Sequence, residues 1–182
     1  GMAAVSLSGD AYATLNGDMY VYADNDALGV YAGGYDSANI DVTGNIEVYS
    51  FFDDGLGIEA YSFGAVDVSV TGNIDVYGFD YATGISATGY SSSVVMTGDM
   101  DVFAQLESAY GITMATDGDA YVSFTGNMDV DGETYAYGIN VDSALGNVTV
   151  YVDGSLDVYA YDNFASAIDI YAEYDIYVSA TG

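Results

Sequence analysis

The hexapeptide Gly72-Asn73-Ile74-Asp75-Val76-Tyr77 returns along the chain in close variants. The six copies begin at Gly17, Gly44, Gly72, Gly98, Gly126 and Gly154, and successive copies start 26 to 28 residues apart. A repeat of this length is typical of solenoids, in which each repeat forms one turn, here called a coil, and stacks on its neighbours. The spacing therefore predicts a solenoid.

Each coil holds two further recurring phrases. One places a small residue two positions before a glycine and a branched residue after it, as in Ala82-Thr83-Gly84-Ile85, and the other ends on a threonine, as in Val68-Ser69-Val70-Thr71. All three phrases are rich in β-branched or aromatic residues and are bounded by Gly, Asn, Asp or Ser, which indicates short strands between turns. We therefore expect an all-β, single-domain, right-handed parallel β-solenoid of about six and a half coils of 26–29 residues, with three short strands per coil and three parallel sheets.

The solenoid is expected to be one continuous domain, residues 1–182, without a linker. Its coils are residues 1–16 (partial), 17–43, 44–71, 72–97, 98–125, 126–153 and 154–182. Alternation along a strand places every second side chain in the core. The expected inward residues are Met19/Val21, Ile46/Val48, Ile74/Val76, Met100/Val102, Met128/Val130 and Leu156/Val158 in the first strand, and Val30, Ile58, Ile85, Ile112, Ile139 and Ile168 in the second.

The glycine that opens each coil follows a threonine and precedes a short polar residue, as in Thr71-Gly72-Asn73. Glycine adopts the backbone angles of a sharp corner, and Asn or Asp side chains hydrogen-bond to bent backbone. We expect a corner at each of these positions, with Asn45, Asn73 and Asn127 stacked as a ladder. Asn147-Val148-Thr149 is the single glycosylation sequon of the chain.

The composition restricts the partners of such a solenoid. The chain has 28 Asp and Glu, no Lys, Arg or His, and a net charge of −28. Nucleic acid and anionic membranes are not expected as partners, because no side chain would neutralise their charge. Crowded carboxylates must be relieved by spacing, protonation, salt or bound metal, so the metal-free protein is expected to be most stable in acid.

Two groups of carboxylates are candidates for metal binding. The first is an outward row on the first strands, one residue after the first inward position: Glu47, Asp75, Asp101, Asp129 and Asp157. The second lies at the turns between the first and second strands: Asp24, Asp26, Asp53, Asp54 and Asp80. Calcium prefers roughly six to eight hard oxygens, which carboxylates and turn carbonyls supply. We expect Ca²⁺ at some of these positions, above all among Asp24, Asp26, Asp53 and Asp54; the alternative is a solvated acidic surface.

A second outward row is mostly aromatic and consists of Tyr22, Tyr49, Tyr77, Phe103, Asp131 and Tyr159. Stacked rings on a parallel sheet stabilise the ladder of strands, which is the favoured interpretation. Aromatic rings beside carboxylates also bind sugars, which is the alternative.

The segment Ala82 to Val102 carries the phrases small-x-Gly-Ile, Val-x-Met-Thr and Gly-Asp-Met-x-Val in order. This pattern resembles the coils of parallel β-helix surface proteins, the autotransporter passengers and the filamentous-haemagglutinin-type adhesins. The resemblance covers essentially the whole chain and is one of fold rather than of catalytic motif. It implies an elongated, exported structure at the cell surface or in the extracellular space.

Both ends of the chain lie inside a coil and lack a capping element. Because an open end exposes strand edges and apolar core, we expect head-to-tail stacking into a homopolymeric filament, or a segment of a longer repetitive chain. The expected function is therefore a structural part of an extracellular filament, with its acidic surface bridged by divalent cations. A glycan-binding adhesin is the alternative function.

Catalysis is not expected. Nucleophilic triads cannot form without His or Cys, and no basic residue is available for a polyuronate lyase. Inverting glycosidases need two carboxylates roughly 6.5–9.5 Å apart, but among so many acids such a pair arises by chance. A polysaccharide-degrading β-helix enzyme is the least favoured alternative.

Overall fold

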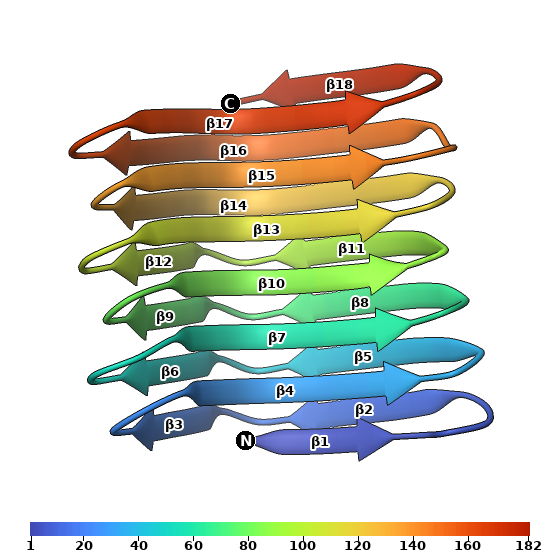
Figure 1. The fold of residues 1–182 in the computed structure, drawn as a ribbon, viewed down its shortest axis with the longest axis horizontal. Helices are drawn as coiled ribbons and strands as arrows, with labels where there is room; N and C mark the ends of the chain where they lie inside the picture. Colours follow the sequence, from blue (N-terminus) through green and yellow to red (C-terminus); the bar gives the residue numbers. More distant parts are fainter.

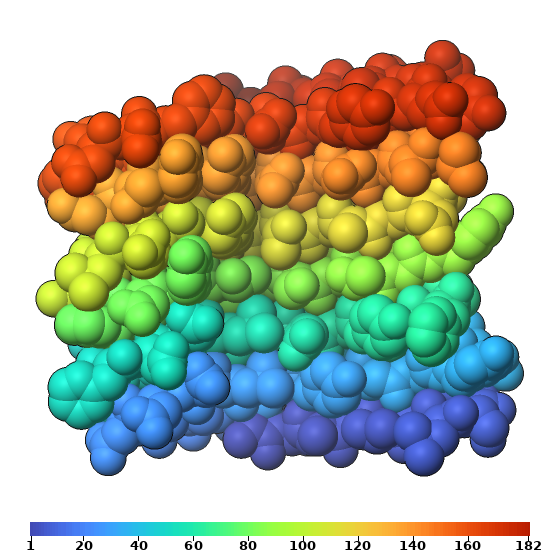
Figure 2. Space-filling view, in the orientation of Figure 1, coloured from blue at the N-terminus to red at the C-terminus, as the bar shows by residue number.

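The structure, a computed structural model, describes residues 1–182 and consists of 18 β-strands without a helix (Figure 1). Every strand pair is parallel, and each coil lies on the preceding one, so that the N- and C-terminal coils are at opposite ends of the stack. In the space-filling view the coils form successive bands in chain order across the face of the molecule (Figure 2). The expected all-β parallel solenoid is confirmed, and no helix could cross a membrane.

The strands form two sheets. The seven-stranded sheet contains β1 (Met2–Val5), β4 (Ala27–Gly34), β7 (Gly55–Ser62), β10 (Ala82–Gly89), β13 (Ser108–Thr116), β15 (Tyr135–Ser143) and β17 (Phe164–Ala172). The 11-stranded sheet contains β2 (Ala11–Asn16), β3 (Met19–Ala23), β5 (Ser37–Thr43), β6 (Ile46–Ser50), β8 (Ala65–Thr71), β9 (Ile74–Gly78), β11 (Ser91–Thr97), β12 (Met100–Ala104), β14 (Ala120–Gly132), β16 (Val148–Ala160) and β18 (Ile176–Thr181).

The expectation of three sheets is therefore wrong. The third strand of one coil and the first strand of the next lie end to end in the same layer, and in β14 and β16 they are one uninterrupted strand. The glycine between them, such as Gly72 with φ 142°, kinks this layer without ending it. The ladder continues through the kink because the Gly72 N–H donates to the Thr97 carbonyl at 2.9 Å. The expected corner is thus a bend within one sheet.

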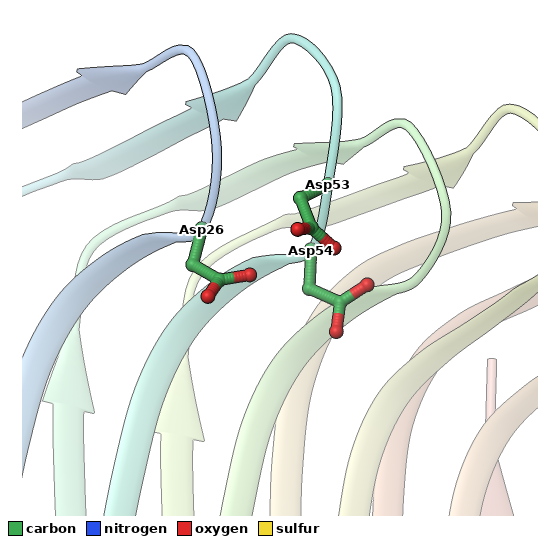
Figure 3. A group of neighbouring side chains, drawn as sticks. All are labelled: Asp26, Asp53 and Asp54. Carbon is green, nitrogen blue, oxygen red and sulfur yellow. The ribbon is translucent and has the colours of Figure 1, made fainter.

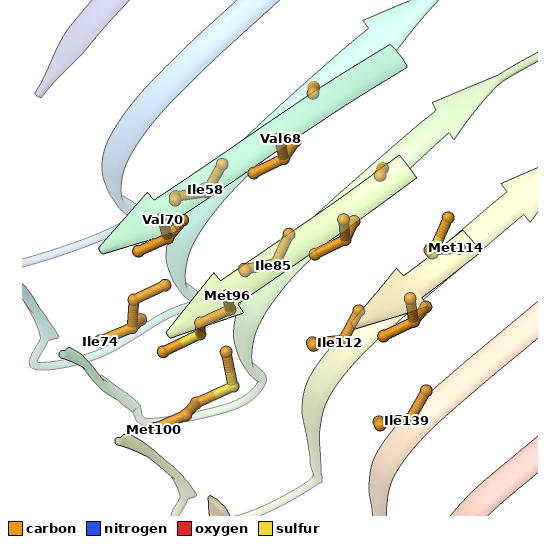
Figure 4. Packing of buried hydrophobic residues seen from close by; sticks show 14 of the residues in the cluster. Ile58, Val68, Val70, Ile74, Ile85, Met96, Met100, Ile112, Met114 and Ile139 are labelled. Carbon is orange, nitrogen blue, oxygen red and sulfur yellow. The ribbon is translucent and has the colours of Figure 1, made fainter. Parts of the chain in front are cut away.

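The core is a single cluster of 39 buried residues between the two layers. Figure 4 shows Ile58, Ile85, Ile112 and Ile139 in a column that follows the stack of coils. All the expected inward residues of the inner coils are buried. The expected inward residues of the two end coils are only partly buried: Met19, Val21, Leu156, Val158 and Ile168.

The glycine of the second phrase has a packing role. Alternation slips by one residue at this point, so that Gly84 and Ile85 are both buried. A Cβ atom on Gly84 would lie 2.6 Å from the Gly111 carbonyl oxygen and 2.7 Å from the Met100 sulfur. Only a residue without a side chain fits there.

Candidate functional site

The outward acidic row is present as expected. Along the 11-stranded sheet, Glu47 is paired with Asp75, Asp75 with Asp101, Asp101 with Asp129 and Asp129 with Asp157. Adjacent strands lie about 4.8 Å apart, which keeps five carboxylates close along one face. Of these five carboxylates, only that of Glu47 accepts a hydrogen bond from a side chain, and the donor is the Tyr22 hydroxyl.

The electrostatic result is a set of carboxyl groups that resist ionisation. Partial burial, followed by the charges of Glu47 and Asp99, raises the pKa of Asp75 above its ordinary value. Partial burial, followed by the charges of Asp129 and Asp75, raises the pKa of Asp101 in the same way. Asp131, which replaces an aromatic residue in the neighbouring row, also has a raised pKa, from burial first and then from the charges of Asp129, Asp101 and Asp157.

Three of the turn carboxylates form a compact group, the Asp26/Asp53/Asp54 cluster (Figure 3). Asp26 comes from the turn between β3 and β4, and Asp53 and Asp54 come from the equivalent turn one coil further along. One carboxylate oxygen from each residue lies within 4.8 Å of the other two. This is a separation that one cation could bridge.

Buried and backbone contacts hold the two turns together. The buried Ser50 hydroxyl donates to the Asn25 carbonyl of the preceding turn at 2.6 Å and accepts from the Asp53 N–H at 3.3 Å. The Ala27 N–H donates to the Asp54 carbonyl at 2.9 Å. Ser50 is the last residue of β6 and Ala27 is the first residue of β4, so these contacts tie the turns that carry the cluster to both strands.

Asp54 carries the electrostatic strain of the cluster. Partial burial is the main cause that raises the pKa of Asp54. The Tyr81 N–H, which donates to the Asp54 carboxylate at 3.1 Å, lowers this pKa. The charges of Asp53, Asp26 and Asp80 raise it further. A bound cation would favour the ionised form and reverse this effect.

The other expected turn residues are not part of the cluster. Asp24 lies in the same turn as Asp26 but is not within this group of three, and Asp80 influences Asp54 only through its charge. The cluster thus unites three of the four residues that were expected to be the main site. Calcium binding by the cluster, and by the acidic row, stays a prediction.

The polar residues after the repeat glycines form the expected ladder. The Asn45 side-chain oxygen accepts from the Asn73 N–H at 2.9 Å, the Asn73 oxygen accepts from the Asp99 N–H at 3.0 Å, and Asp99 accepts from the Asn127 N–H at 2.8 Å. Asp18 begins the ladder by accepting from the Asn45 N–H. Its role is structural, because each side chain satisfies the backbone of the next coil.

A second ladder of the same kind was not expected from the sequence. Asp119 accepts from the Asn147 N–H at 2.8 Å, and Asn147 accepts from the Asp175 N–H at 3.2 Å. The signal was the same 28-residue interval, which also separates these three polar residues. The side chain of the sequon residue Asn147 is thus engaged in the stacking of coils.

The expected aromatic row is a stack of rings beside the acidic row. Tyr49 and Tyr77 lie face to face with centroids 4.1 Å apart and planes 6° apart, and Tyr77 stacks on Phe103 at 5.4 Å. Tyr22 continues the stack with its centroid 6.1 Å from that of Tyr49.

The two rows border a shallow groove of about 320 Å³ along the first strands. Its walls are carboxylates on one side and aromatic rings on the other, from Glu47, Tyr49, Asp75, Tyr77, Asp101 and Phe103. Rings supply flat apolar surface and carboxylates accept hydrogen bonds from hydroxyl groups, so the groove offers the two kinds of contact that a sugar would use.

No protein-family model matches the chain, and neither a curated protein nor a solved structure matches it.

Proposed function

We propose that the chain is a structural element of an extracellular filament, in which further parallel coils continue the solenoid beyond its two end faces. The coils come from another copy of the chain or from adjoining parts of a longer polypeptide. The observation that supports the proposal is the character of the end faces. The strands β1, β2 and β3 at one end, and β17 and β18 at the other, each pair with a single neighbour.

Each end face also presents a slice of the apolar core. At the N-terminal face the partly buried core residues are Met2, Ala4, Leu15, Met19, Val21 and Ala23, and at the C-terminal face they are Leu156, Val158, Ala160, Ile168, Ile170 and Ala172. Unpaired strand edges and apolar surface are both satisfied by one more coil of the same kind. A contact between unlike ends repeats without closing and builds a fibre.

Repulsion between acidic rows opposes this growth, and divalent cations relieve it. The rows continue along the fibre axis, so their charges add with every coil. We propose that calcium bridges carboxylates on this surface, with the Asp26/Asp53/Asp54 cluster as the main site. Fibre growth should then increase with calcium or with salt.

The test compares two valines of the 11-stranded sheet with similar exposure. Val178 of β18 is 44% exposed and stacks on the buried Val150, so it belongs to the C-terminal end face. Val95 of β11 is 38% exposed on the lateral surface. In electron micrographs and sedimentation, the 182-residue protein should form thin fibres, Val178→Asp should abolish them and Val95→Asp should retain them. Discrete particles from the unmodified protein, with or without calcium, would overturn self-assembly.

A second candidate function, an adhesin that binds polysaccharide, is favoured by the groove between the acidic and aromatic rows. Tyr49 and Tyr77 form its aromatic wall. Binding to a glycan array should be lost in Tyr49→Ala and Tyr77→Ala and retained in Tyr90→Ala, an exposed tyrosine outside the groove. Equal array signals from all four proteins, or no signal from the unmodified one, would remove this function.

The extracellular setting rests on the resemblance to parallel β-helix surface proteins. The proposal assigns no catalytic role, because the chain has no His, Cys, Lys or Arg for the common acid–base and nucleophilic arrangements. A cleavage screen on neutral polysaccharides checks this, and release of oligosaccharides would refute it.

A further inference from the structure

Tyrosine is the most abundant oxidisable side chain of this protein. The chain contains 20 Tyr and neither Cys nor Trp nor His. Of the six Met, four are buried: Met96, Met100, Met114 and Met128. The other two, Met2 and Met19, are partly buried at the N-terminal end face, whereas most of the tyrosines are exposed, so a one-electron oxidant in solution meets far more phenol rings than thioethers.

Two of these rings are held in contact across adjacent coils. Tyr49 of β6 and Tyr77 of β9 are register partners, and their rings are the closest and among the most parallel aromatic pairs in the molecule, at 4.1 Å and 6°. Both side chains are partly exposed and border the open groove, so an oxidant has access to them. The sheet thus presents two oxidisable rings to each other.

We propose that Tyr49 and Tyr77 form a site of oxidative cross-linking, where a one-electron oxidant such as peroxidase with hydrogen peroxide joins the two rings as dityrosine. Each ring gives one electron to the oxidant and its phenolic proton to solvent, which leaves two phenoxyl radicals. The radicals pair to form one bond between the ring carbons next to the oxygens. Those two carbons then lose their hydrogens as protons while the two oxygens regain protons. The protein loses two electrons and two protons overall, and one hydrogen peroxide becomes two waters.

Proximity selects this pair over the other tyrosines. Two radicals in one sheet couple without a diffusional encounter, and intramolecular reactions of well-placed groups reach effective concentrations of roughly 10⁵ M or more. Both rings belong to one chain, so the reaction does not depend on filament assembly. Phe103, which stacks on the far side of Tyr77, has no phenolic proton and ends the reactive part of the row on that side. On the other side the Tyr22 ring is farther away, with its centroid 6.1 Å from that of Tyr49.

The cross-link would bind two neighbouring coils covalently. Tyr49 and Tyr77 are separated by a whole coil in sequence, so the bond closes a loop in the unfolded chain as a disulfide does. The oxidised protein should therefore unfold at a higher temperature than the untreated protein.

The test is oxidation of dilute protein followed by peptide mapping. Trypsin cannot cut a chain without Lys and Arg, but cleavage before aspartate releases residues 41–52 and 75–79, which contain one tyrosine each. The expected product is the linked pair of these peptides, lighter by two hydrogen atoms than their sum, in a yield that does not change with protein concentration.

Two variants make the test specific. Tyr77→Phe keeps the ring stack, since the equivalent position in the next coil is already Phe103, and should lose the linked peptides and the gain in unfolding temperature. Tyr90→Phe removes an exposed tyrosine, 59% accessible, that is in no ring pair, and should change neither. Dityrosine that forms mainly between chains, or at Tyr90 rather than at Tyr49 and Tyr77, would overturn the proposal, as would the absence of dityrosine.

Discussion

Asp75 and Asp101 are register partners on the adjacent parallel strands β9 and β12, and both side chains face solvent. Two like charges therefore stand directly opposite each other, with Glu47 and Asp129 continuing the row on either side. Directly opposed like charges destabilise a sheet. The row therefore opposes folding at neutral pH.

The first prediction concerns Asp101. Asp101→Asn removes repulsion with Asp75 and Asp129 and should raise the free energy of unfolding at neutral pH and low salt by a few tenths of a kcal/mol, because exposure and screening limit the effect. Chemical denaturation measures this. The matched control is Asp67→Asn, whose strand neighbours are Asn39 and Ser93 and carry no charge. An equal gain in both variants would contradict the importance of the row.

The second prediction concerns pH. The pKa values of Asp54, Asp75, Asp101 and Asp131 are raised in the folded protein above the ordinary 3.8, first by burial and then by neighbouring carboxylates. The folded state thus binds protons more tightly than the unfolded state. The resulting stability is complete below pH 3.8 and is lost as pH rises through the raised values.

The unfolding temperature of the metal-free protein should accordingly decrease as the pH is raised from acid to neutral at low ionic strength. High salt should make the decline shallower, because it screens the carboxylates from one another. An unfolding temperature that stays constant or rises over this range would show that the crowding has no effect on stability.

The third prediction concerns the repeat glycines. Gly72 has φ 142°, and a Cβ atom there would lie 2.1 Å from the Gly44 carbonyl oxygen. Gly17 at the first coil has φ 112° and no atom within 4 Å of the corresponding position. Backbone strain alone costs about 1–3 kcal/mol. Gly72→Ala should destabilise the folded protein by more than this amount, because the clash adds to the strain, and Gly17→Ala should destabilise it by no more than this amount. Thermal unfolding measures both losses of stability. Equal losses would mean that the clash at residue 72 is relieved by movement of the coil.

The fourth prediction concerns calcium at the Asp26/Asp53/Asp54 cluster. Calcium at one hundred times its dissociation constant should stabilise the folded protein by about 2.7 kcal/mol, and a chelator should reverse the gain. Asp53→Asn should weaken this response by removing one ligand, whereas Asp24→Asn, in the turn of Asp26 but outside the cluster, should preserve it. Titration calorimetry and thermal unfolding report both effects. A response that is the same in the two variants, or no response to calcium at all, would exclude the cluster as a site.

Much of this molecule follows from the period of its sequence. Because one coil has the height of one strand spacing, residues one repeat apart must lie on top of one another. The row from Glu47 to Asp157, the ring stack of Tyr49 and Tyr77 and the ladder from Asn45 to Asn127 were predictable for this reason. The second ladder, through Asn147, obeyed the same rule and could have been found by it.

The sequence alone therefore determined the parallel solenoid, the inward columns and the order of residues along each row, because these depend only on repeat spacing and strand alternation. The tertiary structure decided that there are two sheets rather than three. A glycine such as Gly72 can either end a strand at a corner or bend it within one sheet, and the hydrogen bonds to the coils on either side decide between the two. It also decided that Asp26, Asp53 and Asp54 meet while Asp24 does not. The repeat spacing determines which turns are stacked on one another. The conformation of each turn depends on contacts with the neighbouring backbone, such as those of Ser50 and Asp54.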